Sequence, residues 1–308
     1  MSSVSDIEGE PRALALSANL RGIVSMLCAV GCFSLMDASM KHLTGAYPPM
    51  QVTFIRGAAS LPCVLAITWM LGKWADLRPV RVGLHVARGV LFVFMLWAFV
   101  YAVRILSLAD AYAIFLCAPL LITALSWPVL GERVSAARWV AIIVGLMGVL
   151  LMLRPSGANL VTLGGLAAFG AAIGYAVGAM CIRILSRTDS GSATVFWSLA
   201  VATVIAAFLA WPQWEPLRLE HWPWILAIAI AGTLGQQLIT DAFRRASPAV
   251  VAPFEYTSLL WGVGLDWVLW SVLPDSRMYF GASIVTVSGL YLMWRERRDR
   301  APATASAA

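Results

Sequence analysis

Long apolar stretches dominate this sequence and constrain its fold more than any other feature. A helix needs roughly 20 mostly apolar residues to cross the hydrocarbon core of a bilayer. Only helices and closed barrels satisfy backbone polar groups in lipid, and runs of this length exclude barrel strands. The sequence therefore predicts an all-α polytopic membrane protein with ten transmembrane helices. They lie near residues 20–43, 50–72, 83–103, 108–130, 137–153, 161–184, 192–211, 222–242, 248–272 and 278–294.

The composition excludes an ordinary soluble domain. The 308 residues are 60% hydrophobic and only 12% charged. A soluble domain cannot hide that much apolar surface, because much of its exterior must be polar or charged. We therefore expect the lipid bilayer to surround most of the chain.

The basic residues predict the orientation. If the N-terminus is cytoplasmic, most of the 22 lysines and arginines fall in cytoplasmic loops, as is usual for membrane proteins. The sequence thus predicts a multi-pass protein of the cell inner (cytoplasmic) membrane with both termini in the cytoplasm. This placement also accounts for the net charge of +6, so we expect no nucleic acid as a partner. Residues 1–12 lack the basic start and cleavage site of a signal peptide.

The sequence contains the same arrangement of apolar runs twice. An apolar run in the middle of the chain ends at Arg154, and another near its end closes at Arg295. In both runs a glycine precedes the arginine at the same spacing, Gly148 in the first and Gly289 in the second. Five helices per copy is an odd number, so the second copy must enter the membrane from the opposite side. The sequence predicts two inverted five-helix repeats, 20–154 and 161–295, between cytoplasmic tails 1–19 and 296–308, with a solute site near the midplane.

The motifs of the first repeat closely resemble one family. They are Ala118-Pro119-Leu120, Leu130-Gly131-Glu132, Gly145, Gly148 and Arg154-Pro155. This pattern resembles the drug/metabolite transporter superfamily, specifically its ten-helix branch of paired EamA domains, over about residues 20–295. The resemblance implies two inverted bundles around a central cavity that work by alternating access. The second repeat has Ser271-Val272 in place of Gly131-Glu132, so we interpret Glu132 as a structural residue of a cytoplasmic turn.

Prolines predict broken or kinked helices at equivalent places in the two repeats. Pro119 and Pro128 fall in the fourth helix, and Pro248 and Pro253 fall at the ninth. Proline lacks a backbone N–H and clashes with the preceding turn. Carbonyl groups freed at these breaks are expected to line the solute site.

A secondary transporter is the function that this sequence predicts, with a small-molecule solute as its partner. There is no G-x-x-x-x-G-K-[ST] motif, so we expect no ATP and a gradient as the energy source. The three histidines, His42, His85 and His221, are scattered at helix ends, so we predict no catalytic residue, no metal and no cofactor. A membrane-embedded transferase is the alternative of another class, and solute flux without chemical change distinguishes the two.

The ninth helix favours particular solutes. Pro253-Phe254-Glu255-Tyr256 followed by Pro274-Asp275 resembles family members that move riboflavin or S-adenosylmethionine. This resemblance implies uptake of riboflavin or a similar planar heterocycle. Uptake of S-adenosylmethionine and export of amino acids, other metabolites or drugs are the alternatives.

Polar and aromatic side chains inside the predicted helices are the candidate cavity residues. Charged groups in the membrane cost a few kcal/mol each and usually face an interior or a watery path. Deep tryptophans and glutamines supply stacking surfaces and hydrogen bonds. The predicted substrate cavity consists of Asp37, Arg88, Trp97, Gln236, Gln237, Glu255, Tyr256 and Trp261.

Several of these residues have two interpretations. Asp37 lies one turn from Lys41, so it either forms a local ion pair or contacts the solute and carries a proton. Glu255 either lines the cavity, as the second candidate for proton coupling, or bonds to Arg56 or Arg88 as a structural residue; we favour the lining role. Asp266 is interpreted as structural, with Arg56 or Arg88 as its partner.

Two further predicted cavity positions also leave a choice. Arg88 either meets the solute together with the aromatic residues on its helix face or extends to the cytoplasmic headgroups. Gln236 and Gln237 point about 100° apart on a helix, so we expect one to face the cavity and the other to bind a neighbouring helix.

Overall fold

All regular elements in the described part of the chain are helices. The computed structural model describes residues 5–70, 72, 74–131, 135–153, 162–185, 187–245 and 251–300. The α-helices are α1 (Ser5–Leu43), α2 (Pro49–Met70), α3 (Val82–Ile105), α4 (Leu108–Phe115), α5 (Ala118–Leu130), α6 (Ala136–Leu153), α7 (Leu163–Leu185), α8 (Gly191–Ala210), α9 (Trp222–Arg245), α11 (Ser258–Trp270) and α12 (Ser276–Arg300). The 3-10 helices are η1 (Trp74–Leu77), η2 (Trp211–Gln213), η3 (Leu219–His221) and η4 (Ala252–Thr257).

The prediction of an all-α polytopic membrane protein is confirmed. Among the described residues, seven helical stretches are long and apolar enough to cross a membrane. They are Leu20–Leu43, Pro49–Met70, Val82–Ile105, Leu108–Val129, Leu163–Leu185, Gly191–Gln213 and Leu219–Ala242, and a shorter apolar helix spans Ala136–Met152. α1 begins at Ser5, well before the start predicted at residue 20.

The structure has helix breaks at Pro119 and Pro253, whereas Pro128 does not break its helix. α4 and α5 meet at a break just before Pro119, which stands in the first turn of α5. In the corresponding place of the second half, η4 has Pro253 in its first turn and is followed by α11. Pro128 stays inside α5, whereas Pro248 lies outside the described residues, as does Glu132.

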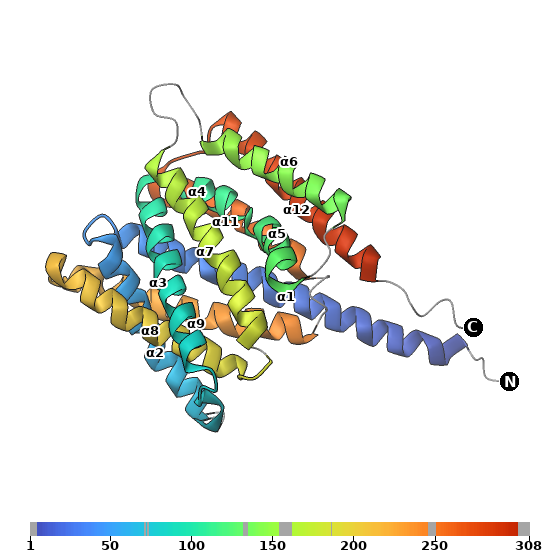
Figure 1. The fold of residues 1–308 in the computed structure, drawn as a ribbon, viewed down its shortest axis with the longest axis horizontal. Coiled ribbons are helices and arrows are strands. Elements are labelled where there is room, and N and C mark those ends of the chain that lie inside the picture. Colours follow the sequence, from blue (N-terminus) through green and yellow to red (C-terminus); the bar gives the residue numbers. More distant parts are fainter. Residues whose placement is uncertain are drawn as a thin grey trace.

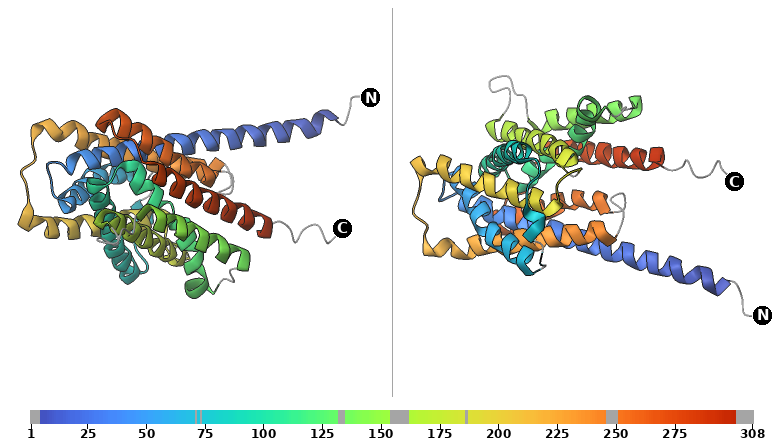
Figure 2. Two further views of the ribbon diagram at one scale, coloured as in Figure 1. Left: turned by 90° about the horizontal axis from the view of Figure 1, so that it is seen from above. Right: turned by 60° about the horizontal axis from the view of Figure 1, so that its bottom comes forward.

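Helices from the two halves of the chain pack against each other in pairs. α1 packs on α9, α3 on α7, α2 on α8, α4 on α11 and α6 on α12. α6 and α12 lie side by side along one edge of the bundle (Figure 1). The free ends of α1 and α12 project from the same end of the bundle (Figures 1 and 2). We call this the N-terminal end and the opposite one the far end.

A contact at the far end ties the loop between α1 and α2 to the segment before α9. The Tyr47 hydroxyl lies 2.8 Å from His221 Nδ1 and accepts a hydrogen bond from the Arg218 backbone N–H at 2.9 Å. The Gln51 side chain donates to the Glu215 carbonyl at 2.6 Å and accepts from its N–H at 2.9 Å. These hydrogen bonds join the first half of the chain to the second. We call them the Tyr47 contact.

A second contact at the N-terminal end ties the loop between α7 and α8 to the start of α3. Asp189 Oδ1 accepts the Val80 N–H at 2.7 Å and lies 2.9 Å from His85 Nε2, and Oδ2 accepts the Thr188 hydroxyl at 2.7 Å. The Thr188 hydroxyl first, and His85 second, hold the pKa of the Asp189 carboxyl well below its ordinary value. Asp189 is therefore ionised at neutral pH and keeps all these partners. We call this the Asp189 contact.

Candidate functional site

The first candidate site is a polar cluster around Asp37 in the far half of the bundle. Asp37 lies on α1 and is 8% exposed. Its Oδ2 accepts a hydrogen bond from the Tyr112 hydroxyl of α4 at 2.8 Å, and Ser34, one turn earlier on α1, bonds to the same tyrosine. Arg56 of α2 interacts electrostatically with both Asp37 and Tyr112. These four residues are the Asp37 cluster, and they bring three helices of the first half together.

Arg56 is the least satisfied member of this cluster. Within the part of the chain that the structure describes, no hydrogen bond or ion pair reaches its guanidinium, although the side chain is only partly exposed. A guanidinium carries five N–H donors in a planar fork that fits carboxylate and phosphate groups. Arg56 can therefore offer donors to an anionic group of a solute.

The second candidate site lies around Glu255 in η4. Tyr175 of α7 interacts electrostatically with Glu255 and with Arg88 of α3, so it lies between a carboxylate and a cation. The Phe115 and Tyr175 rings pack in a T-shaped arrangement with their centroids 5.4 Å apart. No hydrogen bond or ion pair to Glu255 exists among the described residues. Arg88, Tyr175 and Glu255 form the Glu255 cluster, which joins elements of both halves.

Arg88 has one firm anchor. Its Nη1 donates to the backbone carbonyl of Thr194 on α8 at 2.9 Å, and its guanidinium carbon lies 6.0 Å from the Phe92 ring centroid. The anchor holds Arg88 inside the bundle, beside Tyr175. The role of Arg88 as a cavity residue stays a prediction.

Lys41 and Asp266 pair with each other. Lys41 Nζ lies 3.0 Å from Asp266 Oδ1. The alternative in which Lys41 forms a local pair with Asp37 is thus wrong, because Lys41 extends across the bundle to α11. Asp266 has the structural ion pair expected of it, with a lysine as partner in place of Arg56 or Arg88.

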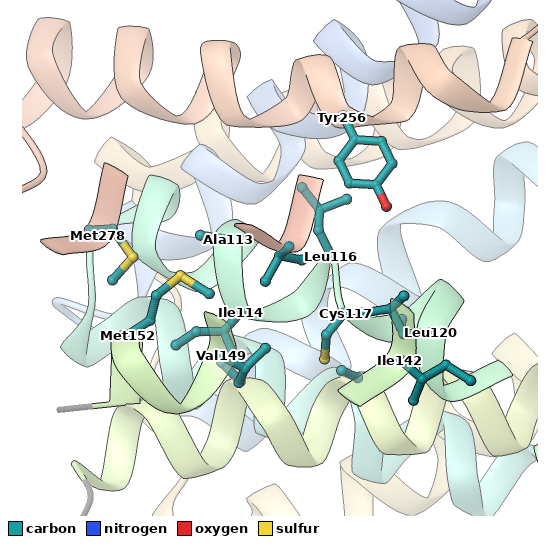
Figure 3. Close-up of a cluster of buried hydrophobic side chains, with 14 of the residues drawn as sticks. Ala113, Ile114, Leu116, Cys117, Leu120, Ile142, Val149, Met152, Tyr256 and Met278 are labelled. Atoms are coloured by element: carbon teal, nitrogen blue, oxygen red, sulfur yellow. The ribbon is translucent and has the colours of Figure 1, made fainter. Parts of the chain in front are cut away.

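The aromatic candidates lie in three different surroundings. Trp97 is half-buried on α3, with its ring centroid 5.8 Å from that of Tyr101. Trp261 of α11 is 46% exposed, and its ring packs against α1 at Gly31. Tyr256 is only 8% exposed and belongs to a buried hydrophobic cluster, which it shares with residues such as Leu116 and Ile142 (Figure 3).

The glutamine candidates are exposed on α9. Gln237 lines a cavity of about 330 Å³ together with Leu234, Leu238, Thr240 and Asp241. Gln236 is also exposed and points to another side of the helix.

A second cavity of about 300 Å³ lies at the far end, near the Tyr47 contact. Its described lining residues are Thr44, Gly45, Ala46, Tyr47, Pro48, Pro49, Arg104, Gln213 and Glu215. The Asp37 and Glu255 clusters line neither of these two cavities.

Sequence reasoning missed the tyrosines of both clusters. Tyr112 and Tyr175 lie inside apolar spans, where a phenol hydroxyl needs a partner, and that need is the signal that could have identified them. It also missed the pairing of His85 with Asp189, because these residues are far apart in the sequence and neither has a local motif.

Comparison with known proteins identifies the family. The model of the EamA-like transporter family matches residues 20–154 and again 162–295. The pseudopaline exporter CntI of Pseudomonas aeruginosa is 28% identical over 274 residues, covering 88% of this chain and 95% of that protein. The riboflavin transporter of Vibrio cholerae is 28% identical over 289 residues, covering 91% and 96%.

Two further similarities agree. The S-adenosylmethionine uptake transporter of Rickettsia prowazekii is 24% identical over 285 residues, covering 92% of this chain and 96% of that protein. A crystal structure of a protein with 21% sequence identity superimposes with a TM-score of 0.61, covering 93% of this chain and 99% of that one, which shows the fold alone. The resemblance seen in the first-repeat motifs is therefore confirmed, and these relatives are transporters rather than enzymes. The chain belongs to the EamA-like transporter family.

Proposed function

We propose that this protein is a secondary carrier of the cytoplasmic membrane, built from two inverted five-helix repeats, that moves a small organic solute by alternating access. The pairing of the helices carries this proposal. If α1, α2, α3 and α6 correspond to α7, α8, α9 and α12, the α1–α9 pair is equivalent to the α7–α3 pair. α2–α8 and α6–α12 each join a helix to its own counterpart. A two-fold axis in the membrane plane, as in inverted-repeat carriers, produces this pattern.

The connections at the two ends of the bundle support the same symmetry. The Tyr47 contact involves the loop after α1, and the Asp189 contact involves the loop after α7, its counterpart. The two contacts lie at opposite ends, as inversion requires. Counting α4 with α5 as one crossing, and η4 with α11 as another, gives ten crossings. The shared location of the free ends of α1 and α12 agrees with two cytoplasmic termini.

The chemistry of the two clusters favours a solute that carries both charges. Arg56 has free donors for an anionic group, and Glu255 has a carboxylate available for a cationic group. Tyr175 and Trp97 add aromatic surface. A planar ring attached to an amino-acid group, as in S-adenosylmethionine, can use all of these features. Uptake of such a zwitterionic heterocycle is the function that we propose.

Riboflavin uptake is the second candidate. An uncharged planar solute would use the aromatic side chains, such as the neighbouring Trp97 and Tyr101 rings, and leave Arg56 unused. The relatives include both an exporter and uptake transporters. The motif Pro253-Phe254-Glu255-Tyr256, which resembles that of uptake members, supports import for this chain.

Arg56→Gln is expected to weaken binding of S-adenosylmethionine by about tenfold or more, which corresponds to roughly 1.4 kcal/mol. The reason is that the variant loses a guanidinium with free donors while the neutral glutamine keeps a similar size. Binding is measured as the rise in melting temperature with ligand concentration, and uptake is measured with labelled S-adenosylmethionine in proteoliposomes. Arg277→Gln is the matched control, because Arg277 is an exposed arginine at the start of α12.

Three outcomes would count against this assignment. If Arg56→Gln and Arg277→Gln weaken binding of S-adenosylmethionine equally, Arg56 does not belong to the solute site. If the protein binds and takes up riboflavin but does not bind or take up S-adenosylmethionine, riboflavin becomes the favoured solute. Release of a chemically altered product would favour the transferase alternative over a carrier.

A further inference from the structure

The ion pair between Lys41 and Asp266 joins the two halves of the chain inside the bundle. Lys41, near the end of α1, donates from Nζ to Asp266 Oδ1 of α11 at 3.0 Å and to the Leu106 carbonyl between α3 and α4 at 2.9 Å. The Lys41 side chain is 14% exposed and that of Asp266 is 0% exposed. The lysine therefore bridges α1, the α3–α4 connection and α11 at a single point.

Asp266 makes a second bond across the same interface. Its Oδ2 accepts the Ala109 backbone N–H at 2.8 Å. Ala109 lies in the first turn of α4, where backbone N–H groups have no acceptor within their own helix. The Trp270 ring covers the lysine, with Nζ 4.6 Å from the ring centroid. Each charge thus has a backbone partner in addition to the other charge.

The backbones of α4 and α11 meet directly beside this ion pair. A Cβ atom added to Gly262 of α11 would lie 2.8 Å from the Tyr112 ring and 3.1 Å from Ala109 Cα. Only glycine allows this approach. Tyr112 is also the residue that bonds to Asp37, so the closed contact adjoins the Asp37 cluster.

The ion pair lies between the Asp37 cluster and the far end of the bundle. Lys41 is one helical turn beyond Asp37 in the direction of the loop between α1 and α2. The ion pair thus stands on the side of the Asp37 cluster that faces the far end. Beyond Lys41, Thr44 and Gly45 line the cavity of about 300 Å³.

We propose that Lys41 and Asp266 form the gate that closes the outer end of the solute path and separates once in each transport cycle. This inference rests on the proposed carrier function, which makes the far end the outer one. A buried ion pair gives little net stability, because desolvation of the charges offsets their attraction. Such a pair can open during a cycle, yet its fixed partners specify the closed state.

The polarity of the gate is set by the backbone. Lys41 meets a carbonyl at Leu106, and Asp266 meets an N–H at Ala109. Exchanging the two charges would place a carboxylate at the carbonyl and an ammonium at the N–H. A gate of this construction requires a cation with N–H donors on α1 and a carboxylate on α11.

The test measures how fast the Asp37 cluster becomes accessible from outside. A protein with all five cysteines replaced carries Ser34→Cys, and a membrane-impermeant methanethiosulfonate reagent is added to the outer face of sealed vesicles. Lys41→Met and Asp266→Asn are each expected to accelerate labelling about tenfold or more. Lys41→Arg is expected to keep labelling slow, because arginine preserves the charge and the donors. The exchange variant Lys41→Asp with Asp266→Lys is expected to label as fast as the neutral variants.

Unchanged labelling in Lys41→Met and Asp266→Asn, or slow labelling in the exchange variant, would overturn the gate. This readout needs no transported solute, so it is distinguishable from a failure of the proposed function. If the neutral variants do not fold, a bis-maleimide cross-link between Lys41→Cys and Asp266→Cys provides the second measurement. It is expected to stop flux of labelled S-adenosylmethionine, and continued flux would overturn the gate. A cross-link between Thr44→Cys and Arg104→Cys, both in the first repeat, is the control and is expected to leave flux unchanged.

Discussion

Replacing Asp37 with Asn and Glu255 with Gln in one protein is expected to abolish the acceleration of solute uptake by an acidic exterior. Carboxylates inside membrane spans are rare, and those that face a polar interior are natural proton carriers. Asp37 faces Tyr112 and Arg56, and Glu255 faces Tyr175. Without an ionisable group at either place, a pH gradient has no coupling site in the two clusters. We expect at least a tenfold loss of gradient-driven uptake, about 1.4 kcal/mol.

The measurement is uptake of labelled S-adenosylmethionine into proteoliposomes with and without an inward proton gradient. Each single variant identifies which carboxylate couples. Solute exchange without a gradient is expected to persist in Asp37→Asn, whereas Glu255→Gln also removes the carboxylate proposed to bind the cationic group and is expected to weaken exchange. Asp76→Asn is the matched control, since Asp76 is an exposed carboxylate in η1. If both single variants and the double variant keep the wild-type response to pH, neither carboxylate carries the proton.

Gly289→Leu is expected to prevent the protein from folding, and Gly289→Ala to lower its melting temperature strongly. Gly289 of α12 lies against Tyr256, and an added Cβ atom would overlap the tyrosine hydroxyl. Tyr256 is held in the hydrophobic cluster around Leu116 and Ile142 (Figure 3). It therefore has little room to retreat. Overpacking of this kind costs about 1–3 kcal/mol and sometimes more.

Melting temperature in detergent and yield of monodisperse protein measure this effect. Gly264→Ala on α11 is the control, because nothing lies within 4 Å of an added Cβ atom there. Gly289→Ala combined with Tyr256→Leu is expected to recover part of the lost stability, since the smaller side chain removes the overlap. Equal melting temperatures of Gly289→Leu and Gly264→Leu would show that the contact with Tyr256 does not limit the size of the side chain at position 289.

Much of the helical layout was predictable because lipid imposes simple rules. Apolar length located the helices, and proline chemistry located the breaks before Pro119 and at Pro253. The matching glycines of the closing runs also have a physical basis. Gly148 and Gly289 both lie where α6 and α12 take part in close helix packing.

The partners of the polar groups were not predictable. Asp37 and Lys41 are neighbours on one helix, which suggests a local pair, but each bonds to a residue from a different helix, Tyr112 and Asp266 respectively. Spacing along one helix says nothing about which side chain a neighbouring helix presents. Tyr256 illustrates the same limit, because it was predicted to line the substrate cavity, whereas its ring lies in a buried hydrophobic cluster.

Equivalent loops of the two repeats provide the most direct test of inversion, on which the carrier proposal depends. Gly45 follows α1, and Arg187 follows α7 at the corresponding position. In a cysteine-free protein, single cysteines at these two positions are labelled in intact cells with a membrane-impermeant maleimide. We expect Gly45→Cys to react from outside, and Arg187→Cys to react only after the membrane is permeabilised. Labelling of both positions from the same side would contradict the inverted repeats and the alternating-access mechanism built on them.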